Sequence, residues 1–190
     1  MHLDNWGLKA KKLGYRSRAV FKLEEIVEKT KALKGCKNVL DIGAAPGGWS
    51  QFISHRIKEA NVYALDILDI DPIDGVKFHK IRIEDIDSTK EIFELKGTFH
   101  LVISDLAPNL TGISVIDESN IYELNDITLN VAVEYLDKSK GVFIIKTFQN
   151  SMLKKLKTKM KGLFDDVQIF KPAASKKQSA EIYLYGAFKE

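Results

Sequence analysis

The stretch Asp41-Ile-Gly-Ala-Ala-Pro-Gly-Gly-Trp-Ser50 decides the fold. The apolar run 38–42 leads into it, and an amphipathic segment that starts at Gln51 leads out. This order predicts a buried strand, a tight glycine turn and a helix. Glycine permits a positive φ and a close approach of a ligand to the main chain, and a helix start offers unpaired N–H groups. An open α/β sheet binds nucleotide-like cofactors at such a turn.

The glycine spacing excludes two common nucleotide loops. It is not G-x-G-x-x-G, and no Lys-Ser or Lys-Thr follows it as in a Walker A loop. A second apolar run, 62–65, ends in Asp66, about 20 residues past the turn, where a carboxylate can hold the hydroxyls of a ribose. Together the two features predict an adenosine-containing cofactor; the alternative is a purely structural turn.

Composition and length predict one soluble domain over residues 1–190. Hydrophobic residues make up 45% and charged residues 29% of the chain, which is ordinary for a globular protein. No apolar run is long enough to span a bilayer, and the N-terminus lacks the apolar core of a signal peptide. The single cysteine, Cys36, cannot form an internal disulfide and is expected to be a small, partly buried side chain. We therefore expect a cytoplasmic protein with no membrane partner.

Charge is distributed unevenly, although the net charge is only +3. One basic cluster lies in the N-terminal segment 1–30, another lies between 154 and 161, and acidic residues concentrate between 66 and 87. Two separated basic clusters on a nearly neutral chain indicate a polyanionic partner. For the second cluster alone, a solvated helix face is the better interpretation.

Strands that alternate with helices predict a mainly parallel α/β sheet. The predicted strands are 38–42, 62–65, 76–83, 99–105, 141–148, 167–170 and 180–188. The predicted helices are 17–30, 48–59, 88–95, 120–136 and 152–163. Residues 1–13 are expected to be weakly ordered or a short helix anchored by Trp6, and 106–116 a loop. Ser88 is expected to cap a helix, with Glu91 completing a capping box.

Charged residues stand at the ends of predicted strands, where open α/β folds place their sites. Asp105 ends one strand and Glu181 opens the last. Lys146 follows four apolar strand residues, where a lysine is costly unless it is paired or faces a cleft. Lys22 lies one turn into the basic helix. Each charge has a simpler explanation, such as a surface charge or a helix cap, but two cations and two carboxylates fit one neutralised cluster.

Five stretches make the sequence closely resemble the FtsJ-like (RlmE-type) 2′-O-ribose methyltransferases. In chain order they are Gly14-Tyr-Arg-Ser-Arg-Ala-Val-Phe-Lys22-Leu, Asp41-Ile-Gly-Ala-Ala-Pro-Gly-Gly-Trp49-Ser-Gln, Ser104-Asp105-Leu-Ala-Pro-Asn-Leu-Thr-Gly112, Ile145-Lys146-Thr-Phe-Gln and Ser179-Ala-Glu181-Ile-Tyr. They extend over nearly the whole chain and are far more specific than a glycine turn. The resemblance implies a Rossmann-like, S-adenosylmethionine-dependent methyltransferase fold. Such a fold has a mostly parallel seven-stranded sheet, an antiparallel last strand and helices on both faces.

The resemblance also implies a Lys-Asp-Lys-Glu catalytic tetrad, which falls on Lys22, Asp105, Lys146 and Glu181. A ribose hydroxyl is a weak nucleophile, so in-line approach and a general base within hydrogen-bond reach both help. Burial and a second cation favour the neutral amine of a lysine, which makes Lys146 the expected proton acceptor. The two carboxylates would orient the lysines. No His, Cys and Asp residues have the spacing of metal ligands, and the reaction requires no metal.

The cofactor contacts implied by the resemblance fall on residues near the glycine turn and the strand ends. Asp66 would hold the ribose, Asp105 would lie on the methionine side, and the glycine turn would line the cofactor. The full set of expected cofactor-binding residues is Gly43, Gly47, Trp49, Asp66 and Asp105. The cofactor would be S-adenosyl-L-methionine and the product S-adenosyl-L-homocysteine.

One position departs from the family pattern. The family often has an Asp after the third strand that contacts the adenine amino group, and here Arg82 stands at that position. Arginine carries only donors and cannot accept from an amino group. Glu84, Asp85 or a main-chain carbonyl are the candidate replacements, and the sequence does not choose among them.

The implied function is 2′-O-methylation of a ribose in RNA by a monomeric enzyme. A uridine of the large-subunit (23S-type) ribosomal RNA fits a short chain with no appended RNA-binding domain. The expected RNA-binding residues are Lys12, Arg16 and Arg18, within the N-terminal segment 1–30. One alternative is a 2′-O-methyltransferase of the transfer-RNA anticodon loop. Another is a non-catalytic RNA-binding factor for ribosome assembly, against which the intact tetrad argues.

Overall fold

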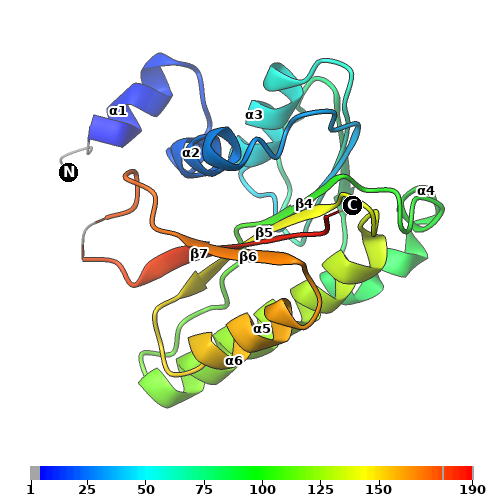
Figure 1. Ribbon diagram of the computed structural model, residues 1–190. Helices are drawn as coiled ribbons and strands as arrows, with labels where there is room; N and C mark the ends of the chain where they lie inside the picture. Colours follow the sequence, from blue (N-terminus) through cyan, green and yellow to red (C-terminus); the bar gives the residue numbers. More distant parts are fainter. Residues whose placement is uncertain (1–4, 177, 190) are drawn as a thin grey trace.

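The sheet is the frame of the molecule (Figure 1). The computed structural model describes residues 5–176 and 178–189. Its seven-stranded sheet has the order β3-β2-β1-β4-β5-β7-β6, and β7 alone runs antiparallel to its neighbours. The strands are β1 Asn38–Ile42, β2 Asn61–Asp66, β3 Val76–Lys80, β4 Leu101–Ser104, β5 Val142–Phe148, β6 Asp166–Phe170 and β7 Glu181–Ala187. The predicted mostly parallel sheet with an antiparallel last strand is confirmed.

Helices cover both faces of the sheet, with α1, α2 and α3 above it in Figure 1 and α5 and α6 below. They are α1 Asn5–Lys12, α2 Val20–Thr30, α3 Gly48–Arg56, the 3₁₀ helix η1 Ile83–Ser88, α4 Lys90–Phe93, α5 Ser114–Tyr135 and α6 Leu153–Lys161. Successive residues of a strand belong to two different apolar clusters because their side chains point to opposite faces of the sheet. Ile144 packs in the cluster under α2 and α3, whereas Phe143 and Ile145 pack in the cluster over α5 and α6. No helix in the part of the chain that the structure describes is long and apolar enough to cross a membrane.

The N-terminal helix α1 is anchored by aromatic packing. The Trp6 ring lies 5.3 Å from that of Phe21 on α2, and Lys9 Nζ lies 4.5 Å from the centre of the Phe21 ring. Aromatic and cation–π contacts of this kind hold short helices that propensity alone would leave marginal. The predicted anchoring role of Trp6 agrees with this contact, and the structure decides for the short helix.

The glycine turn connects β1 to α3 as predicted. Gly43 N donates to Leu65 O at 2.8 Å, which ties the turn to the end of β2. Gly47 has a φ of 99° and caps α3. The positive φ favours glycine, and a Cβ on Gly47 would in addition lie 2.6 Å from Ile73 Cδ1 and displace the end of that side chain. The turn therefore lies at the carboxyl edge of the sheet, next to Asp66.

Two predicted helix starts are wrong, and local side-chain bonds explain both. Helix α2 begins at Val20, because residues 17–19 form a turn in which Ala19 N donates to Ser17 Oγ at 3.1 Å. Helix α5 begins at Ser114, six residues before the predicted start. The Asp117 carboxylate in its first turn accepts from the main-chain N of Thr111 at 2.7 Å and of Gly112 at 3.0 Å. A carboxylate there also suits the helix dipole.

The region after β3 differs most from the prediction. The strand stops at Lys80, and the residues from Ile83 to Ser88 form a 3₁₀ helix that buries Ile83 and Ile86 at a three-residue spacing. Ser88 ends that helix and does not cap α4, and Glu91 accepts from Lys77 Nζ instead of completing a capping box. The predicted strand end and capping box are therefore wrong.

Candidate active site

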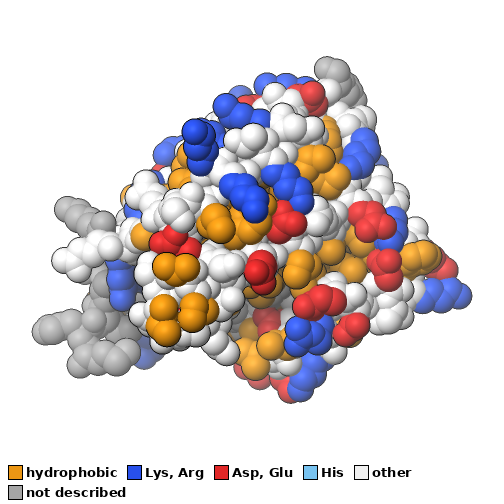
Figure 2. All heavy atoms as spheres, turned by 90° about the horizontal axis from the view of Figure 1, so that it is seen from below, with side chains coloured by type: hydrophobic (Ala, Val, Ile, Leu, Met, Phe, Trp, Pro, Cys, Tyr) orange, Lys and Arg blue, Asp and Glu red, His pale blue; other side chains and the backbone are white. Residues whose placement is uncertain are grey.

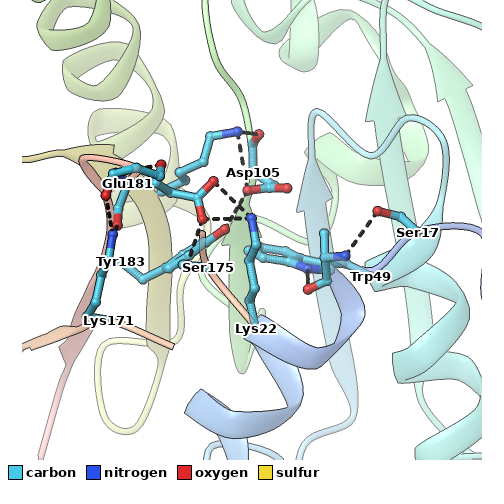
Figure 3. Close-up of polar contacts among 11 residues, drawn as sticks. Ser17, Lys22, Trp49, Asp105, Lys171, Ser175, Glu181 and Tyr183 are labelled. Atoms are coloured by element: carbon cyan, nitrogen blue, oxygen red, sulfur yellow. Dashed lines mark hydrogen bonds and ion pairs between the residues drawn. The ribbon is translucent and has the colours of Figure 1, made fainter. Parts of the chain in front are cut away.

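The four expected catalytic side chains meet at the carboxyl ends of β4 and β5. Asp105 follows β4, and Lys146 lies in β5. Because β7 is antiparallel, its first residue, Glu181, pairs with Phe148 at the end of β5. Lys22 reaches them from α2 (Figure 3). The topology therefore brings together residues that lie up to 159 positions apart in the chain.

Two ion pairs make up this cluster. Lys22 Nζ lies 2.7 Å from Glu181 Oε1 and 2.9 Å from Oε2. Lys146 Nζ lies 3.3 Å from Asp105 Oδ1 and donates to the main-chain oxygen of Asp105. The two lysine side chains are only 9% and 11% exposed. Charges so far removed from water are tolerated because each is paired, so the predicted neutralised cluster is present.

Tyr183 links the two ion pairs, and the sequence reasoning gave it no role. Its hydroxyl donates to Asp105 Oδ1 at 2.9 Å, and Lys22 Nζ lies 5.9 Å from its ring centre. Burial, followed by the charges of Asp105 and Glu181, raises the pKa of Tyr183, so the hydroxyl remains a neutral donor. The sequence held one signal for such a role: side chains alternate between the two faces of a strand, so Tyr183 lies on the same face as Glu181.

Glu181 is held in its ionised form. Burial acts to raise the pKa of Glu181, but the hydrogen bond and charge of Lys22 outweigh it, aided by Ser175 and by the charge of Lys146. The pKa is therefore lowered overall. Ser175 Oγ donates to Glu181 Oε1 at 2.9 Å, and Lys171 Nζ donates to Glu181 O at 2.6 Å (Figure 3). These contacts fix the start of β7 against α2.

A cavity of about 300 Å³ lies beside the glycine turn. Ile67, Ile83 and Leu106 contribute to its apolar walls, and Asp66 contributes a carboxylate. Asp66 Oδ2 accepts from Ala45 N at 2.8 Å, and Oδ1 accepts from Leu68 N at 2.9 Å. Each carboxylate oxygen has a second lone pair, so Asp66 can still accept from a ligand hydroxyl.

A smaller hollow of about 20 Å³ lies on the other side of Gly43, lined also by Asp41, Trp49 and Asp105. Asp41 is fully buried, and its Oδ2 accepts from Ser50 Oγ at 2.6 Å. Burial raises the pKa of Asp41 to about 7, opposed by the Ser50 bond and supported by the charges of Asp105 and Asp66. The sequence placed Asp41 at the start of the stretch expected to bind the cofactor but gave its carboxylate no role of its own, although a carboxylate inside an apolar strand was a visible signal.

Residues 15–189 match the FtsJ-like methyltransferase family. The chain belongs to that family. It is 42% identical over 181 residues to ribosomal RNA large subunit methyltransferase E of Ehrlichia chaffeensis, covering 93% of this chain and 84% of the relative. It is 43% identical over 183 residues to the protein of the same name from Nitrosospira multiformis, covering 95% and 88%.

Solved structures agree with this membership of the FtsJ-like family. A crystal structure described as that of a ribosomal RNA methyltransferase from Plasmodium falciparum superposes with a TM-score of 0.80 at 31% identity, over 92% of this chain and 98% of that one. Human methyltransferase-like protein 13, in complex with SAH, superposes with a TM-score of 0.61 at 16% identity, over 83% and 74%. The second match shows the fold alone. This FtsJ-like chain is therefore a methyltransferase with the fold of S-adenosylmethionine-dependent enzymes.

The expected cofactor residues of this FtsJ-like chain do not all line one space. Gly43 and Asp66 line the larger cavity, whereas Trp49 lines only the smaller hollow. The Trp49 indole N–H donates to Ala19 O at 2.8 Å, and its ring lies 5.8 Å from that of Tyr183. Trp49 therefore joins the glycine turn to α2 and, through Tyr183, to the two ion pairs.

Arg82, at the position where the resemblance implied an adenine-contacting Asp, lines the larger cavity. Arg82 Nη2 pairs with Glu84 Oε1 at 3.0 Å, and both residues line the cavity. Asp85 lines an open hollow next to it. Of the two acidic candidates, Glu84 is thus the one that lines the cavity itself.

The expected RNA-binding residues differ in their surroundings. Lys12 is exposed at the end of α1, and Arg18 lies in the turn before α2. The Arg16 guanidinium donates to three main-chain oxygens, those of Pro46, Asp71 and Pro72. Arg16 is therefore bonded to loops of the cofactor side, a placement that the sequence did not suggest.

Proposed function

We propose that this FtsJ-like enzyme transfers a methyl group from S-adenosylmethionine to a ribose 2′-hydroxyl of RNA in the large ribosomal subunit. The observation that carries the proposal is the amine of Lys146, buried and oriented by Asp105 within a paired cluster beside the glycine turn. Family membership supports methyl transfer. The relatives named ribosomal RNA large subunit methyltransferase E support the RNA class.

The two spaces at the glycine turn suit the two halves of the cofactor. The cavity of about 300 Å³ offers apolar walls for an adenine, Asp66 for its ribose and Glu84 as an acceptor for its amino group. The hollow of about 20 Å³ is too small for the methionine half as it stands. Leu106 packs on Gly43, where a Cβ would come within 2.2 Å of it, and it forms part of the wall of the larger cavity at the turn.

The tetrad of Lys22, Asp105, Lys146 and Glu181 accounts for the proton that leaves the ribose hydroxyl and for the charges of the site. Bound S-adenosylmethionine supplies an electrophilic methyl group on a sulfonium. In its unprotonated form the amine of Lys146 accepts the proton of the ribose hydroxyl, and Asp105 stabilises the resulting ammonium. Tyr183 fixes Asp105 through its 2.9 Å hydrogen bond, and Glu181 holds Lys22. A fixed general base contributes typically about 10²–10⁴-fold to such a reaction.

RNA is expected to bind on the side of α1 and α2. An open hollow there is lined by Lys11, Arg16 and Arg18 among others, and Lys12 follows directly. The opposite side differs: Figure 2 shows basic and acidic side chains interspersed with hydrophobic ones. There Lys159 of the second basic cluster pairs with Asp126 at 2.6 Å, which supports its interpretation as a solvated helix face.

The test is to map 2′-O-methylation on total RNA incubated with the purified enzyme and cofactor. We expect a mark on large-subunit ribosomal RNA, and Lys146→Ala to lower turnover by about 100-fold or more while cofactor and RNA binding persist. Lys154→Ala, on exposed α6, is the matched control. A mark on the transfer-RNA anticodon loop would favour that alternative, and no mark would favour a non-catalytic assembly factor.

Lys146→Arg tests the base role separately. Arginine keeps the positive charge but stays protonated, so it should not restore turnover. Near-normal turnover in this variant would exclude proton acceptance and leave Lys146 with a role in charge and positioning.

A further inference from the structure

Arg16 joins two loops that flank the cofactor site. Its Nη1 donates to Pro46 O in the glycine turn at 3.2 Å and to Asp71 O at 2.7 Å. Its Nη2 donates to Pro72 O at 2.7 Å. Asp71 and Pro72 lie in the loop that follows β2 and Asp66. One side chain therefore holds the turn that meets the cofactor and the loop that leaves the ribose-binding carboxylate.

The main chain around Arg16 is fixed to the same site. Arg16 N donates to Gln51 Oε1 at 3.1 Å, and Gln51 Nε2 donates to Gly14 O at 2.9 Å. Gln51 lies on α3, directly after the glycine turn. The segment that carries the basic residues is thus attached to α3 by two hydrogen bonds of the Gln51 side chain, in addition to the bonds of the Arg16 guanidinium.

The glycine turn is shaped to admit this guanidinium. A Cβ on Gly47 would lie 3.1 Å from Arg16 Nη1 and 2.6 Å from Ile73 Cδ1. The absent side chain of Gly47 leaves the space in which Arg16 and the loop after β2 pack. Arginine suits this place because its planar fork holds donors on separate nitrogens in a fixed geometry, whereas the three donors of a lysine share one nitrogen.

We propose that Arg16 is a positioning residue of the cofactor site and couples the RNA-facing segment to cofactor affinity. This proposal rests on the proposed function, because it assumes that cofactor and RNA occupy the surfaces assigned above. RNA that orders the segment around Lys12 and Arg18 would also order the Arg16 bonds to both loops. By thermodynamic linkage, RNA and cofactor then raise each other's affinity by the same factor.

The test is calorimetry with S-adenosylhomocysteine, with and without a fluorescent oligouridine, on the whole chain. For Arg16→Gln we expect affinity for S-adenosylhomocysteine to fall about tenfold, as for the loss of several hydrogen bonds to charged groups. Arg16→Lys should recover only part of the affinity. The KM for the methyl donor should rise while kcat at saturating donor persists, which a general loss of folding would not produce. The coupling factor measured with RNA should fall towards one.

Arg18→Gln is the matched control, since Arg18 is two positions away and equally charged. It should weaken oligouridine binding and reduce its salt dependence, while affinity for S-adenosylhomocysteine without RNA persists. If Arg16→Gln keeps wild-type affinity for S-adenosylhomocysteine but loses RNA affinity and salt dependence, Arg16 is a phosphate contact and the proposal is wrong. If the wild-type chain binds no S-adenosylhomocysteine, the proposed function fails, and this proposal with it.

Discussion

At the residue scale, Asp41 illustrates a charge kept at a cost in stability. It lies inside β1, fully buried, with hydrogen bonds from the side chain and the backbone of Ser50 and with the carboxylates of Asp105 and Asp66 nearby. Burial and these like charges disfavour its ionised form, which is why its pKa rises to about 7. Proteins keep such groups mainly at functional sites, and Asp41 lines the hollow expected to hold the methionine half of the cofactor.

Replacing Asp41 should therefore stabilise the protein in a pH-dependent way. The pKa of Asp41 is about 7 in the folded protein and about 3.9 in the unfolded chain. Below about pH 3.9 the group is protonated in both states, so its ionisation does not lower the free energy of unfolding. As pH rises through 7 the folded protein must ionise a buried group, and that stability is lost. Asp41→Asn can still accept from Ser50 and carries no charge. Its gain in unfolding free energy should be larger at pH 8 than at pH 5 by about 2 kcal/mol.

Urea denaturation at the two pH values measures this gain. Asp74→Asn, at an exposed carboxylate, is the control and should show no comparable change with pH. Equal gains for Asp41→Asn at pH 5 and pH 8 would mean that Asp41 is ionised normally in the folded protein. Cofactor affinity of the variant should fall even as its stability rises.

The sequence revealed charged site residues better than neutral ones. Lys146 and Asp105 stood out because a charge at the end of a buried strand is costly without a partner. Tyr183 did not, because a tyrosine in an alternating strand has the same pattern as a core aromatic. Its role depends on the β5–β7 register, which places it opposite Lys146. The contacts of Arg16 were missed for a similar reason, since composition shows a charge but not the carbonyls that it meets.

At the element scale, helix α2 ends on an unfavourable residue. Lys31 follows the helix in the left-handed conformation, with φ 58° and ψ 28°. It is the non-glycine residue with a positive φ among those that the structure describes. A side chain in that conformation costs roughly 1–2 kcal/mol, and glycine avoids the cost.

Lys31→Gly should be more stable than Lys31→Ala by about 1 kcal/mol. Both variants remove the lysine charge near the end of the helix dipole, so their comparison isolates the backbone conformation. The measurement is the denaturant midpoint at an unchanged slope. Equal midpoints for the two variants would show that residue 31 leaves the left-handed conformation in solution.

Hydrophobic periodicity predicted where elements occur but not how strands are ordered. The end of the predicted strand 76–83 was wrong because the spacing of buried residues changes there. Ile83 and Ile86 are buried three residues apart, as in a 3₁₀ helix, and not two apart as in a strand. The antiparallel β7 was expected only from the family resemblance, and the order β5-β7-β6 was not predicted. Alternation identifies the buried face of a strand and carries no information about its neighbours.

At the scale of the whole molecule, the two sheet edges bear on oligomeric state. The edge strands are β3 and β6. On β3, Lys77 and Lys80 form ion pairs with Glu91 and Asp69. Charged side chains on an edge oppose pairing with another sheet. We expect a monomer, and sedimentation equilibrium over a range of concentrations should give the mass of one chain; a concentration-dependent dimer would contradict this.

The place of β7 has a consequence for the order in which the enzyme is made. β7 is the seventh strand to be synthesised but lies between β5 and β6 in the sheet. Until it leaves the ribosome, the facing edges of β5 and β6 remain open to wrong partners. Glu181 and Tyr183 arrive on the same strand. Closure of the sheet and completion of the cluster of ion pairs are thus a single late event, so a nascent chain that stops short of Glu181 has neither.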